Sequence, residues 1–264
     1  MIPASEPGSA AAPANPHPVA LLGLPLWAVD FEAAKALLVA AATRSRPSVV
    51  VTPNVDHFVR LHRRPDLKAL YAQADYMFAD GMPVVWASRL FGRPLPGRVT
   101  GADLFVALCR EALHSGRRVF VLGGMPGQEA FLRERYAQVY PGLQVELFCP
   151  AFGFDPAGAE ARQALERMQQ FRPAYVFVCL GFEKQERWAM GLGRELPGGV
   201  VLCVGAAQEF ALGLKRRAPL WMQRSGLEWL WRLLSNPRQL WRRYLLDGPV
   251  FLRLLWQAWR QDRA

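Results

Sequence analysis

Short apolar runs alternate with longer amphipathic segments along the chain from about Val19 onward. The runs are rich in β-branched and aromatic residues, and most end at Gly, Pro or Asp, a pattern that predicts buried strands. They span 48–51, 76–79, 118–122, 144–148, 175–180 and 200–204. Between them, apolar residues recur at helical spacing over 55–71, 84–90, 103–114 and 156–171. This alternation predicts an α/β fold with a Rossmann-like, mainly parallel sheet and helices on both faces.

Composition divides the chain into three parts. Residues 1–18 are rich in Ala, Pro and Ser and contain no apolar run, which predicts a disordered leader rather than a signal peptide. Residues 19–214 carry the alternating pattern and form the predicted core. Residues 215–264 hold eleven Lys/Arg against three acids, together with six of the nine tryptophans. Their apolar spacing predicts a C-terminal appendage of amphipathic helices over 227–234, 240–245 and 250–259.

This appendage supplies most of the formal net charge of +10. Cationic side chains mixed with indoles suit a boundary that is anionic on one side and apolar on the other, so we expect residues 215–264 to bind an anionic membrane surface. Two alternatives stay open: a helical layer packed on the core with solvated basic residues, and a basic nucleic-acid-binding module. Because no recognition motif accompanies the charge, we expect no nucleic-acid partner. No apolar window is long enough to predict a transmembrane helix.

The four cysteines are widely and irregularly spaced at positions 109, 149, 179 and 203. Three of them lie in apolar strand-like or helix-like contexts. This favours buried free thiols in a reducing compartment over disulfides or a zinc site, and it predicts a cytoplasmic protein.

Candidate chemistry lies at the predicted strand ends, because ligands of parallel sheets bind beyond the carboxyl ends of the strands. Asp80 follows a buried strand and precedes Gly81, so its carboxylate could accept a proton from a substrate hydroxyl. The same position suits an N-cap for the helix that begins near Met82, and both interpretations stay open. Thr52 and Asn54 follow another strand and either bind ligand or cap the next helix.

Gly123 and Gly124 could let backbone N–H groups approach a phosphate. They lack the full spacing of a dinucleotide-binding loop, so an NAD(P)-type oxidoreductase of Rossmann fold is only an alternative. Residues 184–186 form a further polar cluster at a strand end, although such clusters are usually solvated loops. The histidines form no ligand-spaced pair and there is no Asp-x-Asp motif, so we expect no metal. No Ser or Cys lies on a recognisable nucleophile elbow, and we expect no cofactor.

Taken in order, eight stretches make the chain resemble the WecG/TagA/CpsF family of bacterial glycosyltransferases. The resemblance covers about residues 20–246. The stretches are Thr52-Pro53-Asn54, 79–85, 98–104, Leu122-Gly123-Gly124, 181–186, 204–207, Arg217-Ala218-Pro219-x-Trp221-Met222 and 226–233. The resemblance implies an inverting, metal-independent transfer of a hexose or N-acetylhexosamine-type sugar from a UDP-sugar to an undecaprenyl-diphosphate-linked saccharide. It also implies work at the cytoplasmic face of the inner membrane.

The resemblance further implies roles for individual residues. Asp80 is the expected general base, Thr52 and Asn54 line the donor pocket, and Arg98 and Gln185 orient substrates. Asp103, Gly123 and Gly124 lie within matching stretches and join the expected substrate-binding set. Arg232 and Arg242, on the appendage, are the candidates to balance charge on the leaving diphosphate, because no cation is expected to do so.

The chain departs from the family pattern at two strand ends. Gln208-Glu209-Phe210 stands where the family usually has Phe-Asp-Phe, and Glu183 stands where it has proline. Both changes lie close to the expected donor or acceptor site. The identity of the sugar and the oligomeric state, including a homo-oligomer, therefore stay open.

Overall fold

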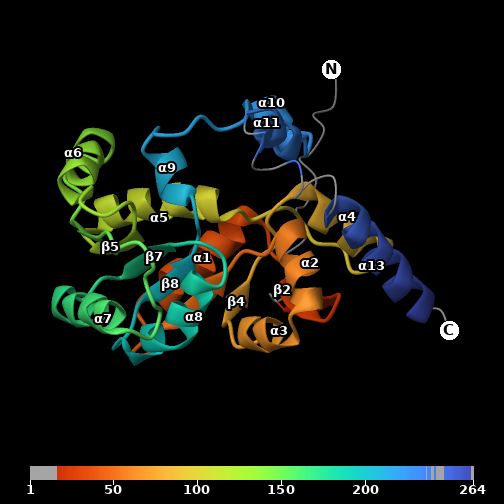
Figure 1. The fold of residues 1–264 in the computed structure, drawn as a ribbon, viewed down its shortest axis with the longest axis horizontal. Helices are drawn as coiled ribbons and strands as arrows, with labels where there is room; N and C mark the ends of the chain where they lie inside the picture. Colours follow the sequence, from red (N-terminus) through yellow and green to blue (C-terminus); the bar gives the residue numbers. More distant parts are fainter. Residues whose placement is uncertain (1–16, 236, 239–240, 242–246, 263–264) are drawn as a thin grey trace, which may run out of the picture.

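The computed structural model describes residues 17–235, 237–238, 241 and 247–262. Its centre is a six-stranded, all-parallel sheet in the order β4-β3-β8-β7-β5-β6 (Figure 1). The strands are β3 (Ser48–Val51), β4 (Tyr76–Met77), β5 (Val119–Gly123), β6 (Val145–Phe148), β7 (Tyr175–Cys179) and β8 (Val200–Cys203). Each corresponds to a predicted run, so the sequence pattern located the whole sheet.

Both faces of the sheet are buried, because successive side chains of each strand point to opposite sides. Val49 and Val51 join one apolar core, whereas Val50 joins the other. The first core is covered by α2 (Val55–Arg63), α3 (Pro65–Tyr71), α4 (Met82–Leu90), α7 (Ala159–Phe171), α8 (Lys184–Met190) and the 3-10 helix η1 (Leu192–Glu195).

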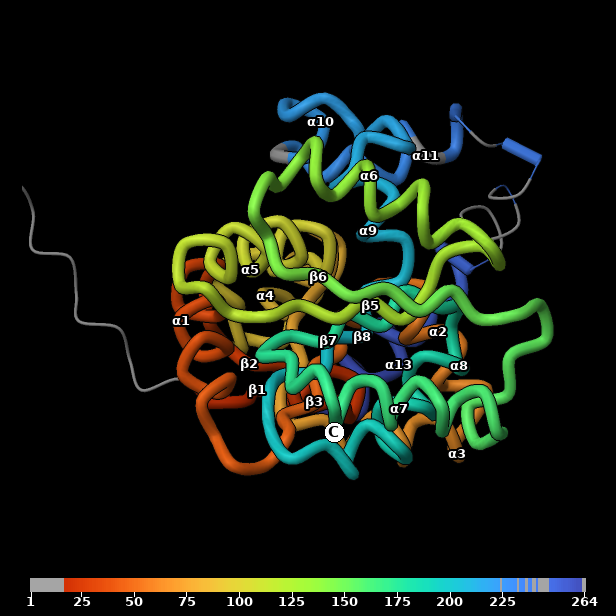
Figure 2. Tube along the Cα trace, turned by 90° about the vertical axis from the view of Figure 1, so that its left-hand side faces the viewer, coloured from red at the N-terminus to blue at the C-terminus, as the bar shows by residue number. Residues whose placement is uncertain are grey.

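The second core is covered by α1 (Phe31–Ala41), α5 (Gly101–Ser115), α6 (Glu129–Val139) and α9 (Ala207–Ala211). In Figure 2, α5, α6 and α9 lie on one side of the strands, and α3, α7 and α8 lie on the other. The predicted α/β class, with a parallel sheet and helices on both faces, is confirmed.

Several local predictions differ from the structure. The helix expected over 55–71 is two helices, because Arg64 precedes Pro65 and leaves the helical region with φ −131° and ψ 82°. The cluster at 184–186 begins α8 rather than forming a solvated loop, and Gln185 and Glu186 are buried. No prediction covered the antiparallel hairpin of β1 (Pro18–Leu21) and β2 (Leu24–Trp27), which packs beside β4.

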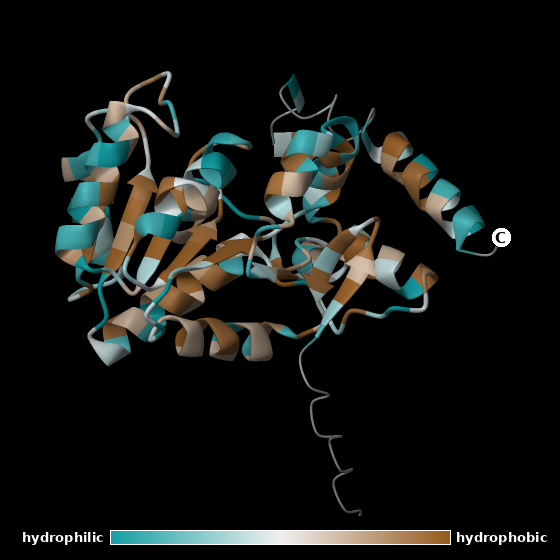
Figure 3. Cartoon of the chain, turned by 90° about the horizontal axis from the view of Figure 1, so that it is seen from below, coloured by the Kyte–Doolittle hydropathy of each residue, from teal (hydrophilic) through white to brown (hydrophobic). Residues whose placement is uncertain are grey.

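The C-terminal appendage contains α10 (Leu220–Arg224), α11 (Glu228–Ser235) and α13 (Asp247–Gln261). Helix α13 lies against α2, with the rings of Phe58 and Phe251 5.9 Å apart. Leu254 and Leu255 are buried with Phe251, whereas Leu252 is exposed, so the helix is amphipathic as predicted (Figure 3). Of the helix expected over 240–245, only Trp241 is among the described residues.

Two further predictions concern the chain as a whole. All four cysteines are free, and all but the partly exposed Cys179 are buried, as expected. Within the described ranges, no helix has both the length and the apolar character needed to cross a bilayer. The leader predicted over 1–18 lies outside the described residues up to position 16, and Pro18 already begins β1.

Candidate active site

A cavity of about 560 Å³ opens beyond the carboxyl ends of β3 and β4. Its walls come from the segments after these two strands, from the start of α4, and from the appendage. The lining residues include Asn54, Val55, Asp56, Asp80, Gly81, Met82, Pro83, Trp86, Arg98, Gln223, Gly226, Glu228, Trp229, Gly248, Pro249, Phe251 and Leu252. The cavity therefore lies where a parallel sheet binds its ligands, and the appendage closes one side of it.

Asp80 lies in the wall of this cavity, three residues after the end of β4. Its backbone N–H donates to the carbonyl of Pro53 at 3.0 Å, which ties the end of β4 to the end of β3. Gly81, with φ +111°, occupies the N-cap position of α4, and no side-chain hydrogen bond caps this helix. The N-cap interpretation of Asp80 is therefore wrong, and its half-buried carboxylate borders the cavity.

Asn54 caps a helix, which is one of the two interpretations that the sequence left open, and ligand binding stays a prediction. It is the N-cap of α2, and its side-chain oxygen accepts from the backbone N–H of Asp56 at 3.1 Å. It also lines the cavity. Thr52 is buried beneath the N-terminus of α5, since a Cβ built at Gly101 would lie 3.0 Å from its hydroxyl oxygen. Both residues lie at the carboxyl end of β3, as predicted.

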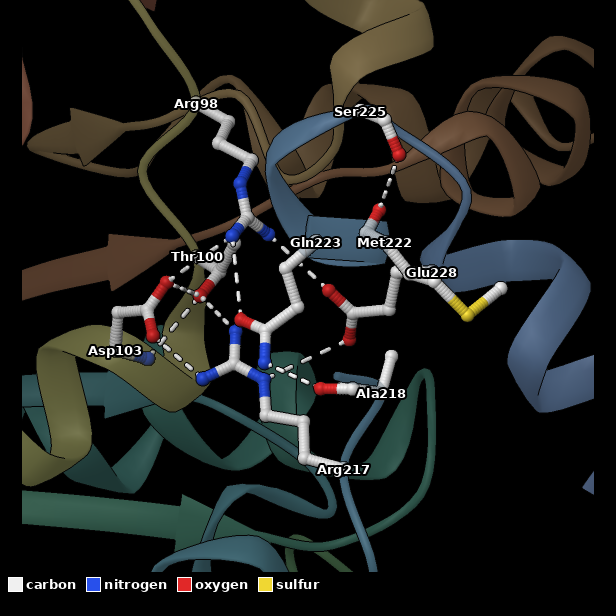
Figure 4. Close-up of polar contacts among 9 residues, drawn as sticks. All are labelled: Arg98, Thr100, Asp103, Arg217, Ala218, Met222, Gln223, Ser225 and Glu228. Atoms are coloured by element: carbon white, nitrogen blue, oxygen red, sulfur yellow. Dashed lines mark hydrogen bonds and ion pairs between the residues drawn. The ribbon is translucent and has the colours of Figure 1, made fainter. Parts of the chain in front are cut away.

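Six side chains connect the core to the appendage next to the cavity (Figure 4). We call them the polar latch: Arg98, Thr100, Asp103, Arg217, Gln223 and Glu228. Arg98, on the loop before α5, donates to Glu228 at 3.1 Å and to Gln223 at 3.4 Å, and it lies 4.0 Å from Asp103. Arg98 therefore borders the cavity, with its guanidinium held by two residues of the appendage.

Arg217 belongs to the appendage and contacts the core, whereas Arg98 belongs to the core and contacts the appendage. Arg217 comes from the start of the appendage, donates to Asp103 in the first turn of α5, and lies 3.7 Å from Glu228. Thr100, the N-cap of α5, donates to the other oxygen of Asp103 at 2.7 Å. Two cations and two carboxylates thus alternate at the junction, so the charges are largely balanced within the latch.

The electrostatics of the latch follow from these contacts. Burial disfavours the charged forms of Asp103 and Arg217. At each side chain, hydrogen bonds and opposite charges outweigh this effect. The hydrogen bond and charge of Arg217 lower the pKa of Asp103 below its usual value. The pKa of Arg217 is raised by Asp103, then by Glu228, and to a lesser extent by Asp80. The last contribution means that the charge of Arg217 is felt at the carboxylate in the cavity wall.

Gln185 lies in a buried network under the end of β8 rather than in the cavity lining. Its side-chain oxygen accepts from the backbone N–H of Gly205 at 3.0 Å, and its amide nitrogen donates to Glu186 at 2.8 Å. Tyr71 also donates to Glu186 at 2.7 Å. Burial raises the pKa of Glu186 above its usual value, although these donors oppose the shift. In this structure Gln185 fixes the loop after β8.

Gly123 and Gly124 lie at the end of β5, which is separated from β3 by β8 and β7. Their φ values are +148° and +107°. A Cβ built at Gly123 would lie 2.5 Å from the carbonyl oxygen of Cys179, and one at Gly124 would lie 2.8 Å from the sulfur of Cys149. Dense packing therefore accounts for both glycines, and neither lines the cavity.

Comparison with known proteins identifies the family. The model of the glycosyl transferase WecG/TagA/CpsF family matches residues 19–264. An N-acetylglucosaminyldiphosphoundecaprenol N-acetyl-β-D-mannosaminyltransferase of Bacillus spizizenii is 31% identical over 202 residues, which are 76% of each chain. The enzyme of the same name from Staphylococcus aureus MW2 is 30% identical over 215 residues, covering 81% of this chain and 80% of its own. The chain belongs to the WecG/TagA/CpsF family.

Membership confirms the resemblance drawn from the eight stretches and identifies the chain as a glycosyltransferase. Two candidate arginines belong to the appendage. Arg232 lies on α11, and Arg242 falls outside the described residues. In the described part of the chain, no group of three or more His, Cys, Asp or Glu side chains is arranged to hold a metal ion. Sequence reasoning gave no function to Arg217, Gln223 or Glu228, although Arg217 and Glu228 lie within two of the family stretches.

The two departures from the family pattern have distinct structural settings. Glu183 has φ +75° and ψ −46°, which proline cannot adopt because its ring fixes φ near −65°. It pairs with Arg64 at 3.3 Å and Arg187 at 2.8 Å, which hold it in this rare conformation. Gln208 is buried, and neither its amide oxygen nor its amide nitrogen has a hydrogen-bond partner. Glu183 is the N-cap of α8 and Gln208 lies in α9, and neither residue lines the cavity.

Proposed function

We propose that the protein transfers a sugar from a UDP-sugar to an undecaprenyl-diphosphate-linked saccharide, in the biosynthesis of a cell-surface or secreted polysaccharide. The observation that carries this proposal is Asp80 in the wall of a strand-end cavity, with Arg98 on the same cavity, in a chain of this family. The relatives named above act on N-acetylglucosaminyldiphosphoundecaprenol, a saccharide linked to a polyprenyl diphosphate.

Asp80 is the proposed general base. Its carboxylate takes the proton of the acceptor hydroxyl as that oxygen attacks the anomeric carbon of the donor. The bond from the anomeric carbon to the UDP oxygen breaks, and UDP leaves with the electron pair. Attack from the side opposite UDP inverts the anomeric configuration. Asp80 lies at the end of a buried strand whose backbone is tied to Pro53, so the base is held on a rigid element.

Positive charge from the protein stabilises the departing diphosphate in this proposal, and no metal ion takes part. Arg98 borders the cavity, and Arg217 lies behind it in the polar latch. Arg232 and Arg242 of the appendage add to this charge. A cationic side chain that is already oriented costs little reorganisation when the leaving group becomes charged. Asn54 lines the donor side, Thr52 is buried at the end of β3 beneath α5, and Gln185 supports the loop after β8.

The proposed base is tested with Asp80→Asn. This change removes the proton acceptor but keeps the shape of the side chain, so we expect a folded protein whose transfer rate falls by at least about 100-fold. Sugar transfer to a lipid-linked acceptor is measured by mass spectrometry with a panel of UDP-sugars. Asp66→Asn, at a half-exposed surface carboxylate that pairs with Arg64, is the matched control. Near-wild-type transfer by Asp80→Asn would contradict the assignment of Asp80 as the general base.

The appendage is the proposed contact with an anionic membrane, at the cytoplasmic face of the inner membrane. Leu220 and Trp221 of α10 and Trp256 of α13 are exposed, and the segment is strongly basic. Exposed indoles beside cationic side chains favour such a surface. We expect the double change Leu220→Ser and Trp221→Ser to reduce cosedimentation with vesicles that contain anionic lipid. The same pair of changes should leave thermal stability almost unaltered, and unchanged cosedimentation would contradict a membrane contact at α10.

A further inference from the structure

The cavity beside Asp80 is lined by side chains of two kinds. Asn54, Asp80 and Arg98 are polar. Pro83, Trp86, Trp229, Pro249 and Leu252 are apolar and come from α4, α11 and α13, and we call these five the apolar end. A single ligand that covers both kinds must itself be amphiphilic, because burying a polar group against these apolar side chains is unfavourable.

The apolar end is built by a close approach of the appendage to the core. Gly226 has φ +74°, and a Cβ at this position would lie 2.8 Å from both Met82 Cβ and the Trp86 ring. Only glycine therefore lets the turn between α10 and α11 pack against α4. On the other side, Phe251 packs on Phe58 and anchors the start of α13. The apolar walls are thus held by packed contacts on two sides.

Large apolar side chains nevertheless remain exposed at this end of the cavity. Trp86 is 47% exposed, although it belongs to a core helix, and Leu252 is 66% exposed. Concave apolar surface that adjoins a catalytic carboxylate is typical of a ligand site. A UDP-sugar offers no aliphatic group to cover these side chains. The acceptor named for the relatives does, because it joins an undecaprenol chain to a sugar through a diphosphate.

We propose that the apolar end, between α4 and α13, binds the isoprene units nearest the diphosphate of the acceptor. The diphosphate then lies toward Arg98, and the sugar that receives the new residue lies toward Asp80. This inference rests on the proposed function and adds to it a direction for the acceptor and a lipid-binding subsite. Leu252, Trp86 and Pro249 are its specificity-determining side chains.

The test compares two leucines of the appendage. Leu252→Ser changes a residue that lines the cavity, whereas Leu234→Ser changes a 69% exposed leucine of α11 that does not line it. Both changes remove the same apolar surface from the appendage, so a membrane effect alone affects both variants alike. Because both side chains are exposed, both variants are expected to fold.

Two acceptors with the same sugar diphosphate are used, one carrying a long polyprenyl chain and one carrying a methyl group. For the polyprenyl acceptor in detergent micelles, Leu252→Ser should raise KM by roughly 5- to 20-fold. The KM for the methyl acceptor and for the UDP-sugar should not change, and Leu234→Ser should alter none of them. Equal effects of the two changes, or equal effects on the two acceptors, would overturn the subsite.

A binding measurement tests the subsite without sugar transfer. Farnesyl diphosphate, a 15-carbon prenyl diphosphate, is titrated into the full-length protein by calorimetry, with methyl diphosphate as the comparison. We expect farnesyl diphosphate to bind at least about tenfold more tightly than methyl diphosphate, and Leu252→Ser to abolish this difference. If the wild type transfers no sugar but keeps this preference, the proposed function fails and the lipid subsite stands. Equal binding of the two diphosphates would overturn the subsite itself.

Discussion

The carboxyl ends of β4 and β5 carry similar motifs but have opposite environments. Asp80-Gly81 after β4 opens into a cavity, and a Cβ at Gly81 would meet nothing closer than Pro83 at 3.7 Å. At the end of β5, Cβ atoms built at Gly123 and Gly124 would lie less than 3 Å from Cys179 and Cys149. One glycine-containing strand end thus borders a cavity, and the other is tightly packed against its neighbours.

The difference teaches that glycine after a strand does not by itself indicate a phosphate site. At β5 the glycines are needed because neighbouring backbone and side chains leave no room for a Cβ. At β4 the space in front of Gly81 lies between the strand ends and the appendage, which the polar latch joins to the core. The strand end that borders the cavity is therefore the one that the C-terminal appendage covers without filling.

The largest effect on stability is expected from Gly123→Ala. The added Cβ meets the Cys179 carbonyl and φ is +148°, so we expect a loss of about 3 to 5 kcal/mol in the free energy of unfolding. Gly81→Ala has only the strained φ of +111° and should lose about 1 to 2 kcal/mol. Urea denaturation of both variants measures the contrast. Equal losses would remove the distinction between a packed and an open strand end.

A smaller effect is expected at the polar latch that joins the appendage to the core. Asp103→Asn removes the charge that pairs with Arg217, and we expect a loss of about 1 to 2 kcal/mol at neutral pH, since the pair is partly exposed. Because folding lowers the pKa of Asp103, its contribution is complete above the unfolded value and disappears as pH falls through the folded one. The two proteins should therefore become equally stable in strong acid.

Urea denaturation from pH 7 downward measures this convergence. Glu209→Gln is the control, because it removes a surface ion pair with Lys215 at the start of the appendage and should cost no more than about 0.5 kcal/mol. A stability difference between wild type and Asp103→Asn that persists unchanged into strong acid would contradict the charge pairing.

The sequence pattern was sufficient for the sheet, because the β-branched runs that form it are buried on both faces and need no distant information. It also identified Asp80, Thr52 and Asn54 at strand ends, which follow from the parallel topology. It did not find the hairpin of 18–27, whose short strands carry a weak pattern. Nor could it show that Arg98 contacts Glu228, because 130 residues separate the two in the chain.

The Asp-Gly and Gly-Gly motifs illustrate the same limit. What distinguishes them is the presence of Cys179 and Cys149 beside Gly123 and Gly124. Such neighbours are set by strand order, which places β7 next to β5, and not by the residues adjacent in the chain. The family stretches contained Arg217 and Glu228, but they did not reveal that Glu228 lies close to both Arg98 and Arg217.

The smallest effect is expected at the buried amide of Gln208 in α9. Gln208 is 3% exposed and its amide has no partner, which costs about 1 to 3 kcal/mol relative to a satisfied or apolar group. Gln208→Met keeps the length of the side chain without the amide, so we expect a gain of about 1 kcal/mol, measured as a rise in Tm. Gln144→Met, at an exposed glutamine, is the control and should leave Tm unchanged. A lower Tm for Gln208→Met would show that the buried amide is paired in solution, for example by a bound water molecule, and would make that end of the sheet a polar site as well.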